Sequence, residues 1–136
     1  MDGLSIAASV IAVVQIAGSV ITYLSEVKNA PKECKKCLME VSCLITLLLK
    51  LKDLSESGST EPWNTAVHAL TVKDGPLDQY KLALEQLLAK VGPENRVRKL
   101  ANVLMWNFVK EEVASILARI ERLKTLVSVA LEMDQW

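Results

Sequence analysis

The residues from Gly3 to Leu24 include no charged side chain, and the first charges after them are Glu26 and Lys28. As a helix, these 22 residues would be about 33 Å long, against roughly 30 Å of bilayer hydrocarbon. Ten of them are Leu, Ile or Val, worth a sum of about −3 to −6 kcal/mol on the membrane-insertion scale. Serine, threonine, glutamine and glycine reduce that sum. The segment therefore predicts an apolar first helix, over about residues 3–28, that lies at the centre of a bundle or in lipid.

Proline and a polar loop divide the next part of the chain. Proline lacks an amide donor and restricts the residue before it, so the first helix should end before Pro31 and a second should start at about that residue. The serine-rich loop 55–60 should end the second helix. A short third helix should begin at Pro62, because proline is tolerated in a first helical turn.

A second turn, at residues 74–76, precedes the remaining helices. The fourth helix should run to Val91 and be closed by the Gly-Pro pair at 92–93. We expect a short fifth helix over about 94–106 and a long last helix capped by Asn107.

Apolar residues recur at three- and four-residue spacing in these segments, which is the pattern of amphipathic helices. They are Leu38, Val41, Ile45, Leu48, Leu51 and Leu54; Trp63, Val67 and Leu70; Leu77, Tyr80, Leu84, Leu87, Leu88 and Val91; and Val113, Ile116, Leu117, Ile120, Leu123, Val127, Ala130 and Met133. The sequence therefore predicts an all-α fold, a bundle of four long and two short helices with an apolar N-terminal helix. Residues 1–136 should form a single domain taken from a longer protein, because the helical pattern still runs at the last residues.

Composition and motifs argue against several classes of function. The 16 basic and 16 acidic residues give no net charge, so no overall field favours nucleic acid. Cys34, Cys37 and Cys43 are too few for a secreted disulfide scaffold and have no second cysteine pair for zinc. We interpret Cys34 and Cys37 as thiols on one helix face, and Cys43 as a core residue. His68 has no evident catalytic partner, and no catalytic motif is present, so we expect neither an enzyme nor a bound cofactor or metal.

The first helix has two competing interpretations, a permanently buried central helix and a membrane-active one. The membrane-inserting residues would be Leu4, Ile6, Val10, Ile11, Val13, Val14, Ile16, Val20, Ile21 and Leu24. Small residues that let helix backbones approach closely would be Ser5, Ala8, Ser9, Ala12 and Gly18. Basic residues that could contact anionic lipid headgroups are Lys28, Lys32, Lys35, Lys36, Arg96, Arg98 and Lys99. A solvated helix face is the plainer interpretation of the basic residues.

The run Leu4-Ser5-Ile6-Ala7-Ala8-Ser9-Val10-Ile11-Ala12-Val13 resembles the opening of the HeLo-like domains at the N-termini of fungal NLR-type (STAND) receptors. The likeness continues through residues 63–67, 75–79 and 111–133. Position 3 is Gly where many of these domains have Pro. The resemblance covers essentially the whole chain.

This resemblance implies a cell-death effector that oligomerises and inserts its first helix to permeabilise the plasma membrane. The expected partners are further copies of the chain, membrane lipids and a downstream receptor or amyloid-type module, with the resting domain in the cytoplasm. In the closed bundle, we expect the first helix to pack against the second, fourth and last helices. The alternative is a soluble homotypic adaptor that stays closed.

Overall fold

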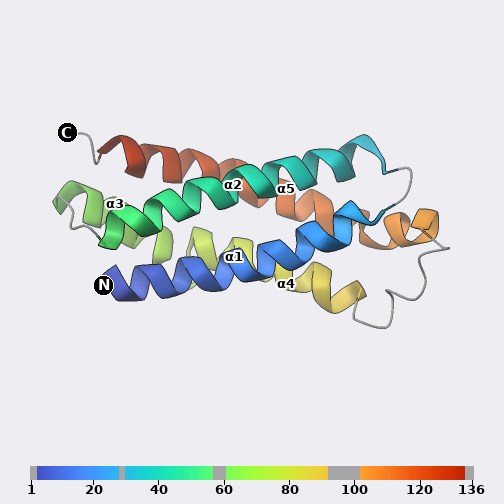
Figure 1. Cartoon of the computed structure of the whole chain (residues 1–136), viewed down its shortest axis with the longest axis horizontal. Helices are drawn as coiled ribbons and strands as arrows, with labels where there is room; N and C mark the ends of the chain where they lie inside the picture. Colours follow the sequence, from blue (N-terminus) through green and yellow to red (C-terminus); the bar gives the residue numbers. More distant parts are fainter. Residues whose placement is uncertain (1–2, 28–29, 57–60, 92–101, 134–136) are drawn as a thin grey trace.

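The computed structural model describes residues 3–27, 30–56, 61–91 and 102–133, and side chains at 6–27, 30–56, 65–90 and 109–132. The helices of this part of the chain are α1 (Gly3–Ser25), α2 (Lys32–Glu56), α3 (Glu61–Thr71), α4 (Pro76–Val91) and α5 (Asn102–Met133). Figure 1 shows that α3 and α4 follow one another along one side of the molecule, so the five helices form four rods. The all-α prediction is confirmed.

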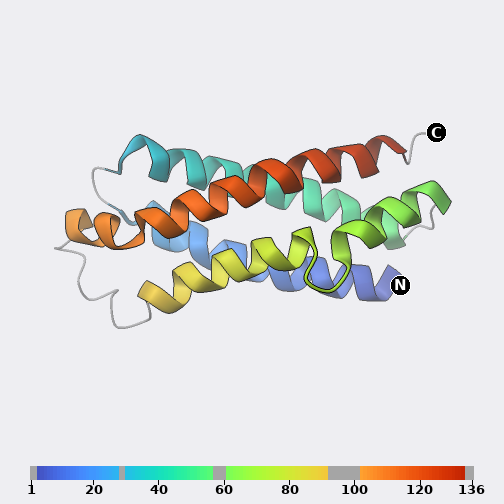
Figure 2. The ribbon, with the colours of Figure 1, turned by 180° about the vertical axis from the view of Figure 1, so that it is seen from behind.

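The rods are arranged as the corners of a square. Helix α1 packs against α2 and α4, whereas α5 packs against α2, α3 and α4. Figure 2, from behind, shows α5 lying between α2 and the α3–α4 rod. Helices α1 and α5 are therefore diagonal neighbours. This corrects two expectations: the first helix lies at a corner of the bundle rather than at its centre, and its main packing partners among the described residues are α2 and α4 rather than the last helix.

Each long helix contributes a stripe of buried residues to the core, at alternating spacings of three and four. In α5 the stripe is Val109, Val113, Ile116, Ile120, Leu123, Val127 and Ala130. In α2 it is Cys34, Cys37, Val41, Leu44, Leu48, Leu51 and Ser55. This spacing keeps one face of a helix directed at its neighbours along its whole length, as in four-helix bundles. Aliphatic side chains dominate the core, as the composition predicts.

The break between α3 and α4 has a local cause. Asp74 has a φ of 60°, a left-handed conformation that aspartate tolerates better than most residues. The amide of Gly75 donates to the Val72 carbonyl at 2.9 Å, and the Asp74 amide donates to Oδ2 of Asp78 at 2.9 Å. Pro76 then opens α4, where its missing amide costs nothing. The turn predicted at residues 74–76 is confirmed.

Several predicted boundaries were wrong. Helix α1 ends at Ser25 rather than at about residue 28, because the amides of Glu26 and Val27 bond three residues back, to Tyr23 and Leu24. Helix α2 continues to Glu56, into the predicted loop.

The prediction of a separate fifth helix was also wrong for the residues that the structure describes. Residues 102–106 belong to α5, and Asn107 lies inside that helix rather than capping it. Asparagine is only a mild helix breaker, and no Gly or Pro interrupts this segment. Residues 94–101 of the predicted helix lie outside the described part.

Candidate membrane-active helix

One face of α1 is built into the core. Its buried side chains are Ile6, Ala7, Val10, Val13, Ala17, Val20 and Leu24. Apart from Ala7, these residues follow the three- and four-residue spacing of the other helices. These side chains hold α1 in the bundle by apolar packing, and most of them are Ala or Val.

The opposite face of α1 is exposed and carries no charge. Ala8, Gln15, Ser19 and Thr22 are exposed, and Ile11 is 42% exposed. The hydroxyls of this face are occupied within the helix: Thr22 Oγ1 donates to the Gly18 carbonyl at 3.1 Å, and Ser19 Oγ donates to the Gln15 carbonyl at 3.5 Å. Such internal bonds lower the cost of moving a hydroxyl from water into lipid.

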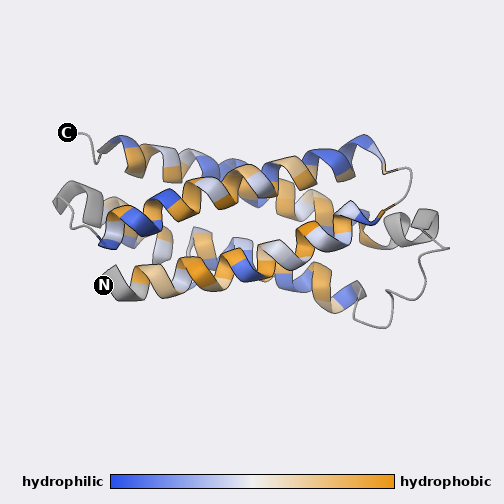
Figure 3. Cartoon of the chain, in the orientation of Figure 1, coloured by the Kyte–Doolittle hydropathy of each residue, from blue (hydrophilic) through white to orange (hydrophobic). Residues whose placement is uncertain are grey.

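Charge separates α1 from the rest of the bundle. Lys124 Nζ lies 2.9 Å from Oε2 of Glu40, linking α5 to α2, and Lys90 Nζ lies 3.1 Å from Oε1 of Glu112, linking α4 to α5. Helix α1 has no charged side chain with which to make such a pair. Figure 3 shows the contrast, since α1 is mostly orange and pale while blue recurs along α2 and α5.

The predicted membrane-inserting residues are divided between the two faces. Ile6, Val10, Val13, Val20 and Leu24 are buried, whereas Val14, Ile16 and Ile21 are partly buried against the core. Ile11 faces outward, and the side chain of Leu4 lies outside the described residues. Insertion into lipid would therefore require α1 to leave α2 and α4.

The predicted helix-association residues lie mainly at the outer side of α1. Ala8 is exposed, and Ser9, Ala12 and Gly18 are partly buried. A methyl group added at Gly18 would meet nothing within 4 Å, so no neighbouring helix of the bundle uses the space above it. The side chain of Ser5 lies outside the described part.

Three of the predicted headgroup contacts are described. Lys32, Lys35 and Lys36 are all exposed in the first turns of α2, close to the end of α1 because the two helices are joined by a short turn. Glu33 is exposed among them and offsets part of their charge. Lys28, Arg96, Arg98 and Lys99 lie outside the described residues.

The cysteine interpretation needs one correction. Cys34 and Cys37 are both buried on the inner face of α2, but Cys43 is exposed rather than in the core. Leu44 takes the core position next to it, because the buried stripe passes from Val41 to Leu44 to Leu48. His68 is exposed on α3, and no group of three potential metal ligands gathers among the described side chains.

Sequence reasoning missed two tyrosines that lie near the cysteines of α2. The hydroxyls of Tyr23 and Tyr80 are buried, and neither has a hydrogen-bond partner among the described residues. Burial, together with neighbouring Cys34, raises the pKa of Tyr23; burial and Cys37 raise the pKa of Tyr80. Tyr80 follows the apolar spacing of α4, and nothing in that spacing separates a packed tyrosine from one whose hydroxyl is unpaired.

The segment Ile6–Ser25 is long and apolar enough to cross a membrane, and only 33% of its most apolar window is buried in the bundle. Length and composition alone establish that property, which core helices of soluble proteins and signal sequences share. Comparison with protein-family models gave no match, and no curated protein and no solved structure is significantly similar to this chain.

Proposed function

We propose that this bundle is a membrane-targeting effector domain of programmed cell death, in which oligomerisation releases α1 and inserts it into the plasma membrane. The observation that carries the proposal is the character of α1. It is a corner helix of the bundle that is uncharged from Gly3 to Ser25 and only one-third buried over its apolar window. Corner helices normally carry charge on their outer face.

Release of α1 exchanges one apolar environment for another. The residues that α1 buries against α2 and α4 are the same type of residue that lipid accepts, so leaving the core costs less in a membrane than in water. No ion pair has to break, since α1 has no charged side chain. Clustering of several copies would raise the local concentration of released helices and favour their association in the bilayer.

The proposal includes three kinds of partner. Further copies of the chain would supply the neighbours that satisfy the side-chain amide of Gln15 inside a bilayer. Lys32, Lys35 and Lys36 would meet anionic headgroups as α1 enters. A downstream receptor or amyloid-type module would supply the trigger. In this scheme, the resting protein is cytoplasmic and the activated protein is at the plasma membrane.

Exposed positions allow a test that separates insertion from folding. Ile11→Glu places a charge in the middle of the apolar segment but on the outer face of the bundle, so the closed fold should persist. In lipid, a central charge costs about 3 kcal/mol. We expect protein clustered by a fused oligomeriser to release dye from anionic vesicles, and Ile11→Glu to abolish that release.

A matched control is available on α4. Leu82 is 54% exposed, so Leu82→Glu makes the same chemical change outside α1 and should leave dye release intact. Val13→Glu is a weaker test because Val13 is buried and its charge would also harm the fold, which circular dichroism would reveal. If clustered wild-type protein leaves vesicles intact, the membrane proposal is wrong.

The second candidate is a homotypic adaptor that stays closed. The buried stripe of α1, with Val10, Ala17 and Val20 each at 0% exposure, is the observation that favours it, because a helix so well seated has a defined place in the resting fold. In that case neither the clustered wild type nor Ile11→Glu would release dye from vesicles, and Ile11→Glu would keep the closed fold. The activity to measure would then be recruitment of a second bundle through an outer surface.

A further inference from the structure

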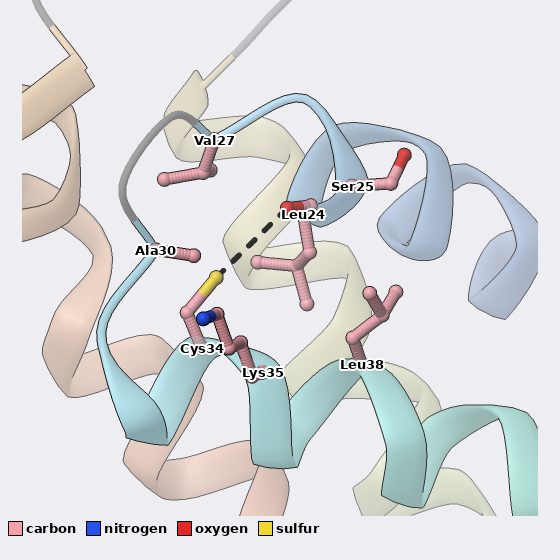
Figure 4. Close-up of a pocket in the computed structure, with 7 residues that line it drawn as sticks. All are labelled: Leu24, Ser25, Val27, Ala30, Cys34, Lys35 and Leu38. Carbon is pink, nitrogen blue, oxygen red and sulfur yellow. Dashed lines mark hydrogen bonds between the residues drawn. The ribbon is translucent and has the colours of Figure 1, made fainter.

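Two buried cysteines lie in the first turns of α2, and the first of them, Cys34, contacts the end of α1. Cys34 and Cys37 are three residues apart, one helical turn, and both are 0% exposed. Sγ of Cys34 lies 3.9 Å from the carbonyl oxygen of Leu24, in the last turn of α1. Figure 4 shows this thiol directed at that carbonyl across the turn that joins the two helices.

An open pocket lies beside Cys34, at the turn between α1 and α2. It has a volume of about 410 Å³ and is lined by Leu24, Ser25, Val27, Ala30, Cys34, Lys35 and Leu38. The hydroxyl of Tyr23 on α1 is buried nearby without a partner among the described residues, and that of Tyr80 on α4 is in the same situation. Buried unpaired hydroxyls destabilise the packing around the cysteine pair.

The closed bundle keeps both thiols unreactive. Burial raises the pKa of Cys34, and burial together with Cys34 raises the pKa of Cys37 to about 12. Thiolates rather than thiols attack electrophiles and bind metals. Once uncovered, Cys34 would lie in the first turn of a helix, where the helix dipole lowers thiol pKa values.

We propose that Cys34 and Cys37 form a two-thiol binding site for soft, thiophilic metal ions and trivalent arsenicals, closed while α1 lies on α2 and opened when the end of α1 lifts away. Soft ions prefer sulfur ligands, and one turn of helix brings two sulfur atoms to the same face. Binding replaces two S–H bonds with two bonds to the ion and releases two protons. An occupant would then fill the space that Leu24 takes in the closed bundle, and so oppose the return of α1.

The probe for this site is phenylarsine oxide. It condenses with two thiols to form two As–S bonds and one water, and arsenic remains trivalent throughout. Intact-mass spectrometry of the full chain would count the arsenicals bound. We expect slow uptake of one arsenical per chain by the wild type. Cys34→Ser and Cys37→Ser should lose the stable adduct, and Cys43→Ser should keep it, because Cys43 is exposed and outside the pair.

Two matched truncations separate local opening from global unfolding. Leu24 and Leu51 are 2% and 1% exposed, but Leu51 lies near the far end of α2. Leu24→Ala should accelerate uptake at least about tenfold relative to Leu51→Ala, which corresponds to about 1.4 kcal/mol in the opening equilibrium. Equal acceleration by both variants would show that uptake follows global unfolding, and would overturn the role of α1 as the cover.

Hydrogen exchange tests the effect of the occupant. In the adduct, amide exchange over residues 6–25 should increase while exchange over 109–132 stays as in the free protein. Unchanged exchange in α1 would mean that an occupied site still accepts the closed bundle. A stable adduct in either single-serine variant would show that the two thiols do not form the site. The absence of an adduct even with Leu24→Ala would show the same. None of these outcomes depends on membrane activity.

Discussion

Tyr80 lies among the largest fully buried side chains of the protein, and its hydroxyl has no hydrogen-bond partner among the described residues. An unpaired buried hydroxyl costs about 1–3 kcal/mol. Tyr80→Phe removes the hydroxyl and keeps the ring, so we expect the free energy of unfolding to stay the same or to rise. Urea denaturation would measure it. A clear loss of stability would show that the hydroxyl has a partner after all.

Cys37 should make the protein sensitive to alkali. Its pKa is raised by burial from 9.0 to about 12, so between those values the unfolded chain releases a proton that the folded chain retains. Unfolding is then favoured as pH rises, by at most about 1.4 kcal/mol per pH unit. Cys37→Ala should therefore reduce the slope of the unfolding free energy against pH between about pH 9 and pH 11, with the unfolding free energy measured by urea denaturation at each pH. Equal slopes in wild type and Cys37→Ala would contradict the assignment.

The residues of the core could be predicted from spacing only to within a position or two. Leu38 and Ile45 follow the helical spacing but are partly buried, while Leu44, absent from the predicted stripe, is fully buried. Both sets fit an amphipathic α2. Which face turns inward depends on the neighbours that α1 and α5 provide, and no single helix contains that information.

At the scale of the elements, the turn between α3 and α4 depends strongly on one residue, Gly75. A Cβ at Gly75 would lie 2.7 Å from Cγ1 of Val72 and 2.8 Å from its carbonyl oxygen, and a backbone oxygen cannot move aside as a side chain can. We expect Gly75→Ala to lower the free energy of unfolding by about 1–3 kcal/mol. Thermal and urea denaturation would both report the loss.

Gly18 provides the matched control. It lies inside α1 with nothing within 4 Å of an added Cβ, so Gly18→Ala should stabilise the bundle by about 0.5–1 kcal/mol, the usual gain for replacing a helical glycine. If Gly18→Ala destabilises the protein as much as Gly75→Ala, the outer face of α1 is in contact with something, and a second chain would be the first possibility to examine by sedimentation.

The breaks between elements could be predicted where proline or glycine makes them. Pro31, Pro62 and the turn before Pro76 all mark helix starts to within a residue or so. Asn107 was a poor guide because its side chain can cap a helix or lie within one, and the apolar spacing from Val109 onward favours continuation. Helix ends without a strong breaker, such as Ser25, depend on local hydrogen bonds that the sequence does not specify.

For the whole molecule, the distribution of ion pairs predicts an order of opening. The pairs Lys124–Glu40 and Lys90–Glu112 join α5 to α2 and to α4, whereas α1 has no charged side chain with which to form such a pair. We expect native-state hydrogen exchange to show lower protection in α1 than in α5, with α1 opening as a unit. Protection in α1 equal to that of α5 would mean that the bundle opens only as a whole.

The sequence identified α1 as the distinctive segment because its lack of charge is a property of the segment alone. Its position at a corner of the bundle arises only when the four rods pack together. The same packing divides α1 into a buried face and an exposed face. For that reason the predicted inserting residues include both buried Val10 and outward-facing Ile11. The same reasoning could not find the cover over Cys34, which joins residues from two helices and the turn between them.

The diagonal placement of α1 and α5 means that α1 can be removed without separating the other helices. Helix α5 contacts α2, α3 and α4 directly. The ion pairs Lys124–Glu40 and Lys90–Glu112 also connect these helices without α1. A chain starting after Ser25 should therefore retain most of its helical circular dichroism, and the remainder could serve as a platform from which a detached first helix reaches a surface.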